Sequence, residues 1–271
     1  MKITLDFTKT VEENAAIYFE KSKKAKKKLE GALETVQRYQ KKLKKEQREY
    51  QDLENESAVA NENNHAKPVK RAWYEKFRWF VSSEGFLVIG GRDATTNEIV
   101  IKKHTDKEDF VFHTDMAGSP FFVIKVKEKL SKLEIKKPTD ATFMEAAQAT
   151  GAFSRAWKLG LTTLDVFYVK PDQVSKETEA GEYMAKGSFM IRGKREYVPF
   201  GKLEIAISFF EGRIISGPVS AIKKITTDYL VIIQGKDKTS DAAKKIKKKF
   251  GGTPDDIIRM LPAGGLKVIM Q

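Results

Sequence analysis

The sequence predicts an α+β protein: a mostly antiparallel sheet with flanking helices, preceded by an N-terminal coiled-coil helical arm. Residues 12–54 contain no proline and a single glycine, and they carry apolar or small residues at heptad spacing, which is typical of a coiled coil. From Pro68 onward, short alternating segments are separated by turn residues, which is typical of antiparallel strands. These two patterns predict a helical coiled-coil arm and linker over residues 1–67 and an α+β domain over residues 68–271.

The arm is predicted to be one helix with an apolar seam and a strong positive charge. Between Lys21 and Arg48, twelve basic residues stand against three glutamates, so most of the excess charge of the chain lies here. A run of charged residues on a helix usually means only that this face is exposed to solvent. Here the basic residues are concentrated in one half of a heptad helix, which favours contact with RNA. The basic residues of this interpretation are Lys23, Lys24, Lys26, Lys27, Lys28, Lys41, Lys42, Lys44 and Lys45. The apolar rows must then be buried in a dimer or against the globular domain.

Nine strands and four helices are expected beyond the arm. The strands are predicted at residues 73–81, 86–89, 110–113, 121–126, 164–169, 188–192, 203–210, 213–216 and 229–234. The helices are predicted at residues 94–104, 140–159, 240–250 and 253–261. Pro138 and Thr139 signal the start of the second helix, and Pro254 suits the first turn of the fourth. Because strands outnumber helices and do not alternate with them, a sheet built from repeated βαβ units is excluded.

Five aromatic residues between Trp73 and Phe80 could either stack on RNA bases or pack in the core. In an extended strand they alternate between two faces, so that Trp79 and Phe80 point to opposite sides. This alternation favours core packing over base stacking. Trp157, on the long predicted helix, is likewise expected in the core.

The composition limits the classes of function. With no cysteine, the chain cannot use thiol nucleophiles, disulfides or cysteine-based zinc sites, and a reducing, cytoplasmic location is expected. The sequence opens without a signal peptide and its apolar runs are strand-sized, so no membrane partner is expected. Fifty basic residues against thirty-seven acidic ones leave a net charge of +13, which favours an acidic partner such as nucleic acid.

No segment matches a known catalytic template. The nearest candidate for a phosphate loop is residues 187–195, but it does not fit the motif. Its two glycines are separated by five residues instead of four, and Arg195 stands at the position of the hydroxyl residue that binds magnesium. His113 and Asp115 share one face of a strand end, so with Glu98 they are the candidates for an RNA-processing enzyme. The simpler interpretation is a strand-end histidine bonded to a loop carboxylate. We therefore expect no enzyme activity, no cofactor and no metal site.

Two segments carry the pattern of a phosphate contact. A pair of glycines permits a tight turn before Arg92, so the start of the following helix could present Arg92, Asn97 and backbone N–H groups to an anion. Alternatively, Asp93 caps this helix and Arg92 pairs with a carboxylate. Basic residues bracket residues 188–192 in a pattern that could follow RNA phosphates, or could only protect an edge strand from aggregation. The candidate RNA-binding residues are Arg92, Asp93, Asn97, Lys102, Lys103, His113, Asp115, Lys186, Arg192, Lys194 and Arg195.

Several blocks of the sequence resemble one family. Residues 70–125, which include the run DFVFHTDMAGSPFFVIK, resemble the RNA-binding domain of the NFACT family. Residues 145–157, 166–183 and 186–197 are similar to later blocks of that domain, and residues 5–32 resemble the entry into the family's middle coiled coil. The resemblance implies a non-catalytic RNA-binding protein of ribosome-associated quality control. It also implies binding to the large ribosomal subunit, rRNA and tRNA on stalled nascent-chain complexes, and support for C-terminal tailing of the stalled chain.

Two departures from the family pattern affect this expectation. The resemblance does not extend to the family's N-terminal domain, NFACT-N, so the expected partners include a separately encoded NFACT-N half besides a second copy bound through the coiled coil. Family members often have a histidine in the loop after Asp115, where this chain has Ala117. Two other functions stay open at this point: the RNA-processing enzyme, and a protein-interaction module in which the arm recruits a partner and its charge is incidental.

Overall fold

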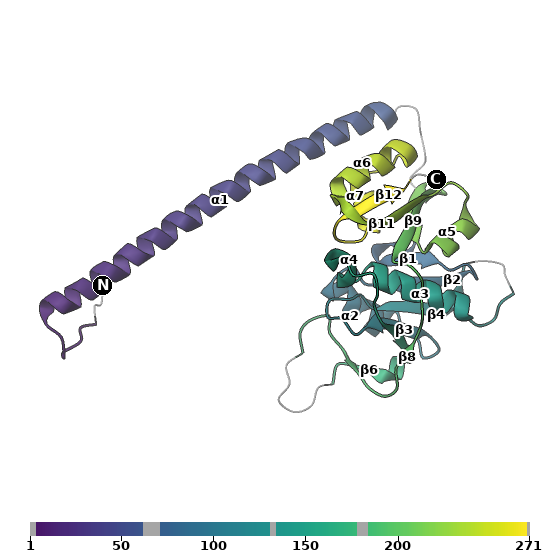
Figure 1. The fold of residues 1–271 in the computed structure, drawn as a ribbon, viewed down its shortest axis with the longest axis horizontal. Coiled ribbons are helices and arrows are strands. Elements are labelled where there is room, and N and C mark those ends of the chain that lie inside the picture. Colours follow the sequence, from purple (N-terminus) through teal and green to yellow (C-terminus); the bar gives the residue numbers. More distant parts are fainter. Residues whose placement is uncertain (1–3, 62–70, 131–133, 178–183, 270–271) are drawn as a thin grey trace. The chain divides into compact units, whose positions relative to one another are not determined.

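The computed structural model describes residues 4–61, 71–130, 134–177 and 184–269, with side chains described for all of these except 45–61 (Figure 1). The chain divides into two units, Met1–His65 and Ala66–Gln271. The first unit contains one long helix. The second contains two larger antiparallel sheets with flanking helices, which confirms the predicted α+β class.

The arm helix α1 (Val11–Asn61) runs beyond the predicted residues 12–54. A capping box starts it: the Thr10 hydroxyl accepts from the Glu13 N–H at 3.2 Å, and the Glu13 carboxylate accepts from the Thr10 N–H at 2.8 Å. The apolar row is exposed in the described arm, where Leu29 is 60% exposed. The coiled coil therefore stays a prediction. Residues 62–67 of the predicted linker lie outside the described residues.

The described strands form three sheets, and every pairing between them is antiparallel. In spatial order, the six-stranded sheet contains β1 (Arg78–Val81), β2 (Phe86–Gly90), β4 (Phe122–Lys129), β3 (Phe110–Thr114), β5 (Val166–Val169) and β8 (Glu196–Tyr197). The four-stranded sheet contains β10 (Arg213–Gly217), β9 (Glu204–Phe210), β11 (Leu230–Asp237) and β12 (Leu266–Ile269). A short pair joins β6 (Val174–Ser175) to β7 (Met190–Ile191).

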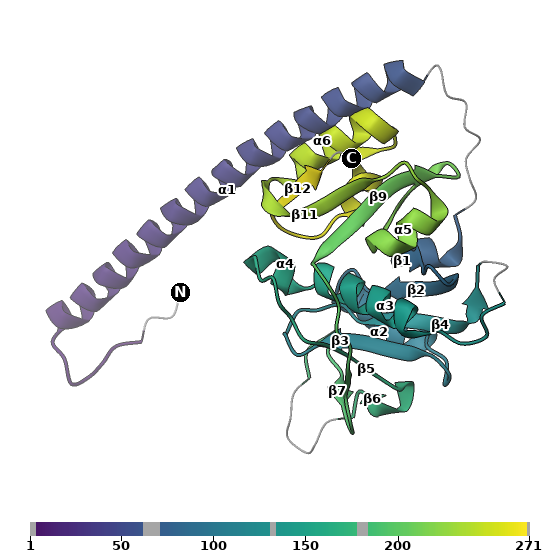
Figure 2. The same cartoon turned by 45° about the vertical axis from the view of Figure 1, so that its right-hand side comes forward.

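Helices flank these sheets (Figures 1 and 2). The α-helices are α2 (Ala94–Lys103), α3 (Asp140–Ala152), α4 (Arg155–Leu159), α5 (Val219–Ile225), α6 (Thr239–Phe250) and α7 (Pro254–Met260). Two short 3-10 helices are η1 (Trp73–Lys76) and η2 (Pro171–Gln173). No helix in the described ranges is both long and apolar enough to cross a bilayer.

Alternating side chains divide the interior of the second unit into connected cores. On β2, Ile89 packs in the same cluster as Val100 of α2, whereas Val88 faces the opposite cluster with Ala146 of α3. The α2-side cluster also contains residues from one face of the four-stranded sheet, such as Val231. The other face of that sheet packs against α6 and α7. This shared core fixes the two larger sheets relative to each other.

Several element boundaries differ from the prediction. The predicted strand at 73–81 begins as the 3-10 helix η1, so Trp73 leaves the alternation and is partly exposed, while Trp79 and Phe80 are buried on opposite faces as expected. The predicted helix 140–159 is broken because the Ser154 hydroxyl accepts from the Ala156 N–H at 3.1 Å and starts a new helix. The predicted strand 188–192 shortens to β7. Helix α5 and strands β6, β8 and β12 were not predicted.

Candidate nucleic-acid interface

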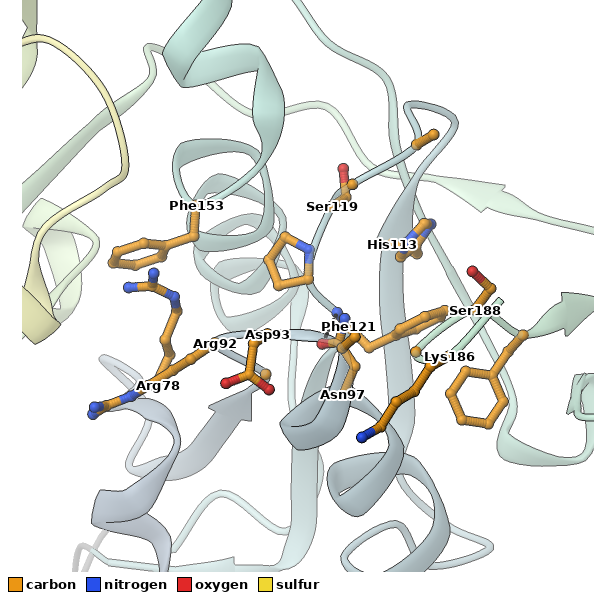
Figure 3. Close-up of a pocket in the computed structure, with 17 residues that line it drawn as sticks. Arg78, Arg92, Asp93, Asn97, His113, Ser119, Phe121, Phe153, Lys186 and Ser188 are labelled. Atoms are coloured by element: carbon orange, nitrogen blue, oxygen red, sulfur yellow. Dashed lines mark hydrogen bonds between the residues drawn. The ribbon is translucent and has the colours of Figure 1, made fainter. Parts of the chain in front are cut away.

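A pocket of about 410 Å³ opens at the N-terminal end of α2 (Figure 3). Its walls come from the end of β2 and the start of α2, from Arg78 on β1, from the loop 117–121 and from the segment 186–189. Figure 3 shows Arg78 and Arg92 on one side of this pocket and His113 and Lys186 on the other. Three basic side chains and one acidic side chain, that of Asp93, are found among the described residues that line it.

The start of α2 is held by its own side chains. The Asp93 carboxylate caps the helix by accepting from the Thr96 N–H at 2.8 Å, and this bond is the main reason that the pKa of Asp93 is lowered. The Asn97 amide oxygen accepts from the Phe121 N–H at 3.2 Å and so links the helix to the residue that precedes β4. A Cβ at Gly91 would collide with the Asn97 amide, so only glycine fits there. Asp93 and Asn97 therefore hold the start of α2 in place, and the Asp93 cap already occupies the Thr96 N–H.

Two arginines in the wall are held by backbone carbonyl groups. The Arg92 guanidinium donates to the carbonyl oxygens of Glu75 at 3.2 Å and Phe77 at 2.8 Å. The Arg78 guanidinium lies 4.1 Å from the Phe153 ring centre and donates to the carbonyls of two residues near the end of α7. Carbonyl groups orient a guanidinium without neutralising it. The alternative interpretation is therefore met in one half only: Asp93 caps the helix, but Arg92 makes no ion pair with a carboxylate among the described contacts.

The pKa values of both arginines are lowered, mainly by burial. Burial, and then the neighbouring charge of Arg92, lower the pKa of Arg78 to about 10. Burial, and then the charge of Arg259, lower the pKa of Arg92. Both side chains stay cationic at neutral pH. The Nε atom of Arg92 is also buried without a hydrogen-bond partner among the described residues.

Lys186 reaches the rim because Glu98 anchors its segment. The Glu98 carboxylate accepts from the Gly187 N–H at 3.1 Å and pairs with Lys176 at 2.7 Å. These contacts, with the Lys176 bond the largest cause, lower the pKa of Glu98 to about 2. Gly187 has a φ of +82°, and a Cβ there would lie 2.5 Å from the Ala94 Cα atom. The backbone at Gly187 therefore packs against Ala94 of α2 with no room for a side chain.

His113 forms an uncharged part of the wall. Its ring stacks on Phe121 with ring centres 4.2 Å apart, and burial lowers its pKa below the ordinary value, so it is neutral at pH 7. Asp115 instead pairs with Arg195 and accepts from the Tyr197 hydroxyl at 2.9 Å. The simpler expectation of a histidine bonded to this carboxylate is thus not met, because Arg195 and Tyr197 hold Asp115.

The proposed catalytic set is not assembled. Glu98 is engaged by Lys176 and Gly187, and Asp115 by Arg195, so neither carboxylate is bonded to His113 among the described contacts. No group of three or more histidine or acidic residues within the described ranges could hold a metal ion. The geometry gives no support to the RNA-processing alternative.

The remaining candidates differ in how far their charge is compensated. Lys194 pairs with Glu196 at 2.8 Å, Lys102 pairs with Glu98 at 3.6 Å, and Arg192 donates to the Glu177 carbonyl at 3.4 Å. Lys103 is exposed, and the described residues offer it no hydrogen-bond or ion-pair partner. In the arm, Lys23, Lys24, Lys26, Lys27, Lys28, Lys41, Lys42 and Lys44 are exposed, and the Lys45 side chain lies outside the described residues. Of the candidates, Arg92, Lys186 and His113 line the pocket, whereas Arg195 and its partner Asp115 do not.

Sequence reasoning missed Arg78. It is not among the candidate residues identified from the sequence. Its partners are the carbonyls of Arg259 and Leu261, more than 180 residues away in sequence, so no local signal predicts these contacts.

Comparison with known proteins relates most of the second unit to one family. Residues 76–193 match the family model of the NFACT protein RNA binding domain, and this segment contains every charged residue that lines the pocket. The chain is 40% identical over 209 residues to the archaeal Rqc2 homolog aRqcH of Methanocaldococcus jannaschii, covering 74% of this chain and 30% of that protein. It is 35% identical over 211 residues to the ribosome quality control complex subunit NEMF homolog of Drosophila melanogaster, covering 76% of this chain and 20% of that protein.

Further matches agree with this picture. Human ribosome quality control complex subunit NEMF is 34% identical over 201 residues, which is 72% of this chain and 17% of that protein. The chain thus spans less than a third of the length of each of these relatives. Among solved structures, the C-terminal part of the fibronectin/fibrinogen-binding protein of Streptococcus suis aligns with a TM-score of 0.36 at 18% identity, over 50% of this chain and 49% of that chain, and no conclusion follows from so low a score.

Proposed function

The chain belongs to the NFACT family, whose RNA-binding domain it carries, and from this premise we propose that the pocket at the start of α2 binds a phosphate group of RNA. One observation carries the proposal: Arg78 and Arg92 are oriented by backbone carbonyls, and neither makes an ion pair with a carboxylate among the described contacts. Lys186 adds a third cation at the rim. A phosphate would supply the missing negative charge through charge-assisted hydrogen bonds.

Within this proposal, each part of the pocket has a separate task. Charged walls around a concave site concentrate the positive potential and attract a polyanion. The guanidinium groups bind a phosphate with fixed geometry, and Lys186 adds a mobile point charge. The neutral His113 and the Phe121 ring beneath it close the side of the pocket without adding charge. Contacts of this kind hold RNA in register and read no sequence.

At the level of the cell, we infer a role in ribosome-associated quality control, because two of the matching relatives are named as subunits of the ribosome quality control complex. The proposed partners are the large ribosomal subunit, rRNA and tRNA on stalled nascent-chain complexes in the cytoplasm. The chain would support C-terminal tailing by positioning RNA, while the ribosome carries out peptide-bond chemistry. The lysines of the arm are proposed as a further phosphate contact.

The exposed apolar row of α1 supports a second copy of the chain as a partner. Leu29 and Val36 stand seven residues apart on this row and are both more than half exposed. Sedimentation of the wild type and of a Leu29→Lys/Val36→Lys variant tests this, since a dimer that the variant abolishes is expected. A separately encoded NFACT-N half is the alternative partner, and a monomeric wild type would favour it.

Salt-dependent RNA binding by Lys186→Gln tests the pocket. Each lost phosphate contact is expected to lower the slope of log affinity against log salt by roughly 0.7–0.9. Lys136→Gln is the matched control, because Lys136 is exposed and has no partner among the described contacts. Equal slopes for the wild type and Lys186→Gln would show that the pocket does not hold a phosphate.

A further inference from the structure

A second concentration of positive charge lies outside the segment that matches the RNA-binding family model. Residues 236–249 contain seven lysines against two aspartates, and most of them belong to α6. This helix packs on the outer side of the four-stranded sheet, and both views show it away from α2 (Figures 1 and 2). It is therefore separate from the pocket.

One face of α6 is fully used inside the protein. Ala242, Ala243 and Ile246 are buried and pack in the same cluster as Leu230 of β11 and Leu266 of β12. Two small alanines let the helix approach the sheet closely, and the isoleucine fills the remaining space. The helix is thus seated by its apolar face, and its lysines project from a rigid support of about 18 Å, at 1.5 Å per residue.

Carboxylates compensate only part of this charge. Lys245 pairs with Asp237 at 2.8 Å and Lys249 pairs with Asp228 at 2.7 Å, and both ion pairs are partly exposed. Exposed pairs of this kind are weak and exchange readily for other anions. Lys244 and Lys248 are one helical turn apart and exposed, and neither has a partner among the described contacts.

From this arrangement we propose that the exposed face of α6 binds the phosphate backbone of RNA as a second contact surface, additional to the pocket. The proposal rests on the proposed function, because it assumes that the chain binds RNA. Ammonium groups on flexible stems act as point charges and suit phosphates without base recognition. The surface is therefore expected to add affinity and salt dependence but no sequence preference.

The buried apolar face decides against two other partners of basic amphipathic helices. A membrane-surface helix inserts its apolar side into the lipid, and a helix that docks in a protein groove buries its apolar side in that groove. In α6 this side is already occupied by the core of the four-stranded sheet. Only the lysine face is accessible, and it fits a polyanion.

The test compares two double substitutions in the full chain, with bulk tRNA as the probe. Lys244→Gln/Lys248→Gln removes two charges from α6, and Lys223→Gln/Lys224→Gln removes two exposed charges from α5 as a matched control. The α6 variant is expected to lower tRNA affinity about tenfold at 50 mM salt and to reduce the salt slope by roughly 1.4–1.8, whereas the control changes affinity less than twofold. Circular dichroism melting curves confirm that both variants keep the fold.

Three results would overturn the proposal. Equal losses in both variants would mean that total charge matters rather than the α6 face. Unchanged tRNA binding in the α6 variant, with Lys186→Gln still weakened, would remove this surface and leave the proposed function standing. Loss of binding to phosphatidylserine vesicles, with tRNA binding intact, would assign the face to lipid. A wild-type chain that binds no tRNA would instead refute the proposed function itself.

Discussion

Besides burial, the charge of Arg92 lowers the pKa of Arg78 in a wall where backbone carbonyls, and no carboxylate among the described contacts, bond both guanidinium groups. Each guanidinium is held by two carbonyl oxygens, and the pKa of Arg78 falls to about 10 through burial and the charge of Arg92. The repulsion between these like charges raises the free energy of the empty pocket. An anion that enters between them lowers that free energy, so binding and stability are coupled here.

Replacing Arg92 with methionine tests this coupling. We expect Arg92→Met to weaken RNA binding about tenfold, as for a lost charge-assisted contact of about 1.4 kcal/mol. The variant also leaves the carbonyls of Glu75 and Phe77 without their donor, which should cost about 1–3 kcal/mol of stability. Thermal melts with and without a short RNA measure both effects: RNA should raise the wild-type melting temperature more than that of the variant. An equal rise in both proteins would contradict the coupling.

Asp93→Asn is expected to strengthen RNA binding. Asparagine caps a helix about as well as aspartate, so α2 should keep its start while the pocket loses its acidic lining residue. Affinity should rise a few-fold at low salt, and the gain should shrink as salt increases. The opposite result, a loss of affinity, would show that the Asp93 carboxylate itself contacts RNA.

The same variant has a defined pH dependence. The pKa of Asp93 is lowered in the folded state, so its charge stabilises the fold above the ordinary value of 3.8 and this stabilisation fades as the pH falls through the lowered pKa. In urea unfolding, the stability advantage of the wild type over Asp93→Asn should therefore be smaller at pH 3 than at pH 7. A gap that is the same at both pH values would argue against a charged cap.

Sequence patterns predicted those features of the fold that depend on neighbouring residues. Alternation placed Trp79 and Phe80 on opposite faces, and Pro138 with Thr139 marked the start of α3. The break at Ser154 was missed because a serine inside a helical pattern cannot be distinguished from an ordinary polar residue of that helix. Its role as an N-cap is visible only in the structure, where its hydroxyl accepts from the Ala156 N–H.

The candidate site was harder to predict than the fold, because contacts between distant segments build it. Arg92 and Lys186 were found from their local patterns, but the carbonyl partners that leave Arg78 charged come from the end of α7. The basic face of α6 was overlooked because the arm carries a larger excess of charge in sequence. The packing of Ala242 and Ile246 against the sheet shows which face of α6 is buried and which face exposes its lysines, and this packing is seen only in the structure.

Glu145→Gln should change how stability depends on pH. The Glu145 carboxylate is 3% exposed and accepts from the Ser83 N–H at 2.8 Å and the Ser220 hydroxyl at 2.6 Å, and burial raises its pKa. Because the folded state prefers the protonated acid, this group contributes most stability below its ordinary pKa of 4.5 and loses it as the pH rises through the raised value. The stability of the variant relative to wild type should therefore increase between pH 4 and pH 8 in urea titrations. A difference that stays constant, or that falls with pH, would contradict the raised pKa.

Gly187→Ala should separate the position of Lys186 from its charge. The alanine Cβ would meet the Ala94 Cα atom at 2.5 Å on a backbone with a φ of +82°, so the segment must move away from α2 and carry Lys186 off the rim. We expect RNA affinity to fall as far as in Lys186→Gln, together with about 1–3 kcal/mol of stability.

Gly160→Ala is the matched control for this prediction. Gly160 also has a positive φ, +71°, but an added Cβ there meets nothing within 4 Å, so the substitution imposes backbone strain without displacing a neighbour. It should reduce stability by about 1 kcal/mol and leave RNA affinity unchanged. If both alanine variants lose RNA affinity in proportion to their stability, general destabilisation explains the effect; if only Gly187→Ala does, the close contact between Gly187 and Ala94 positions the lysine for the phosphate.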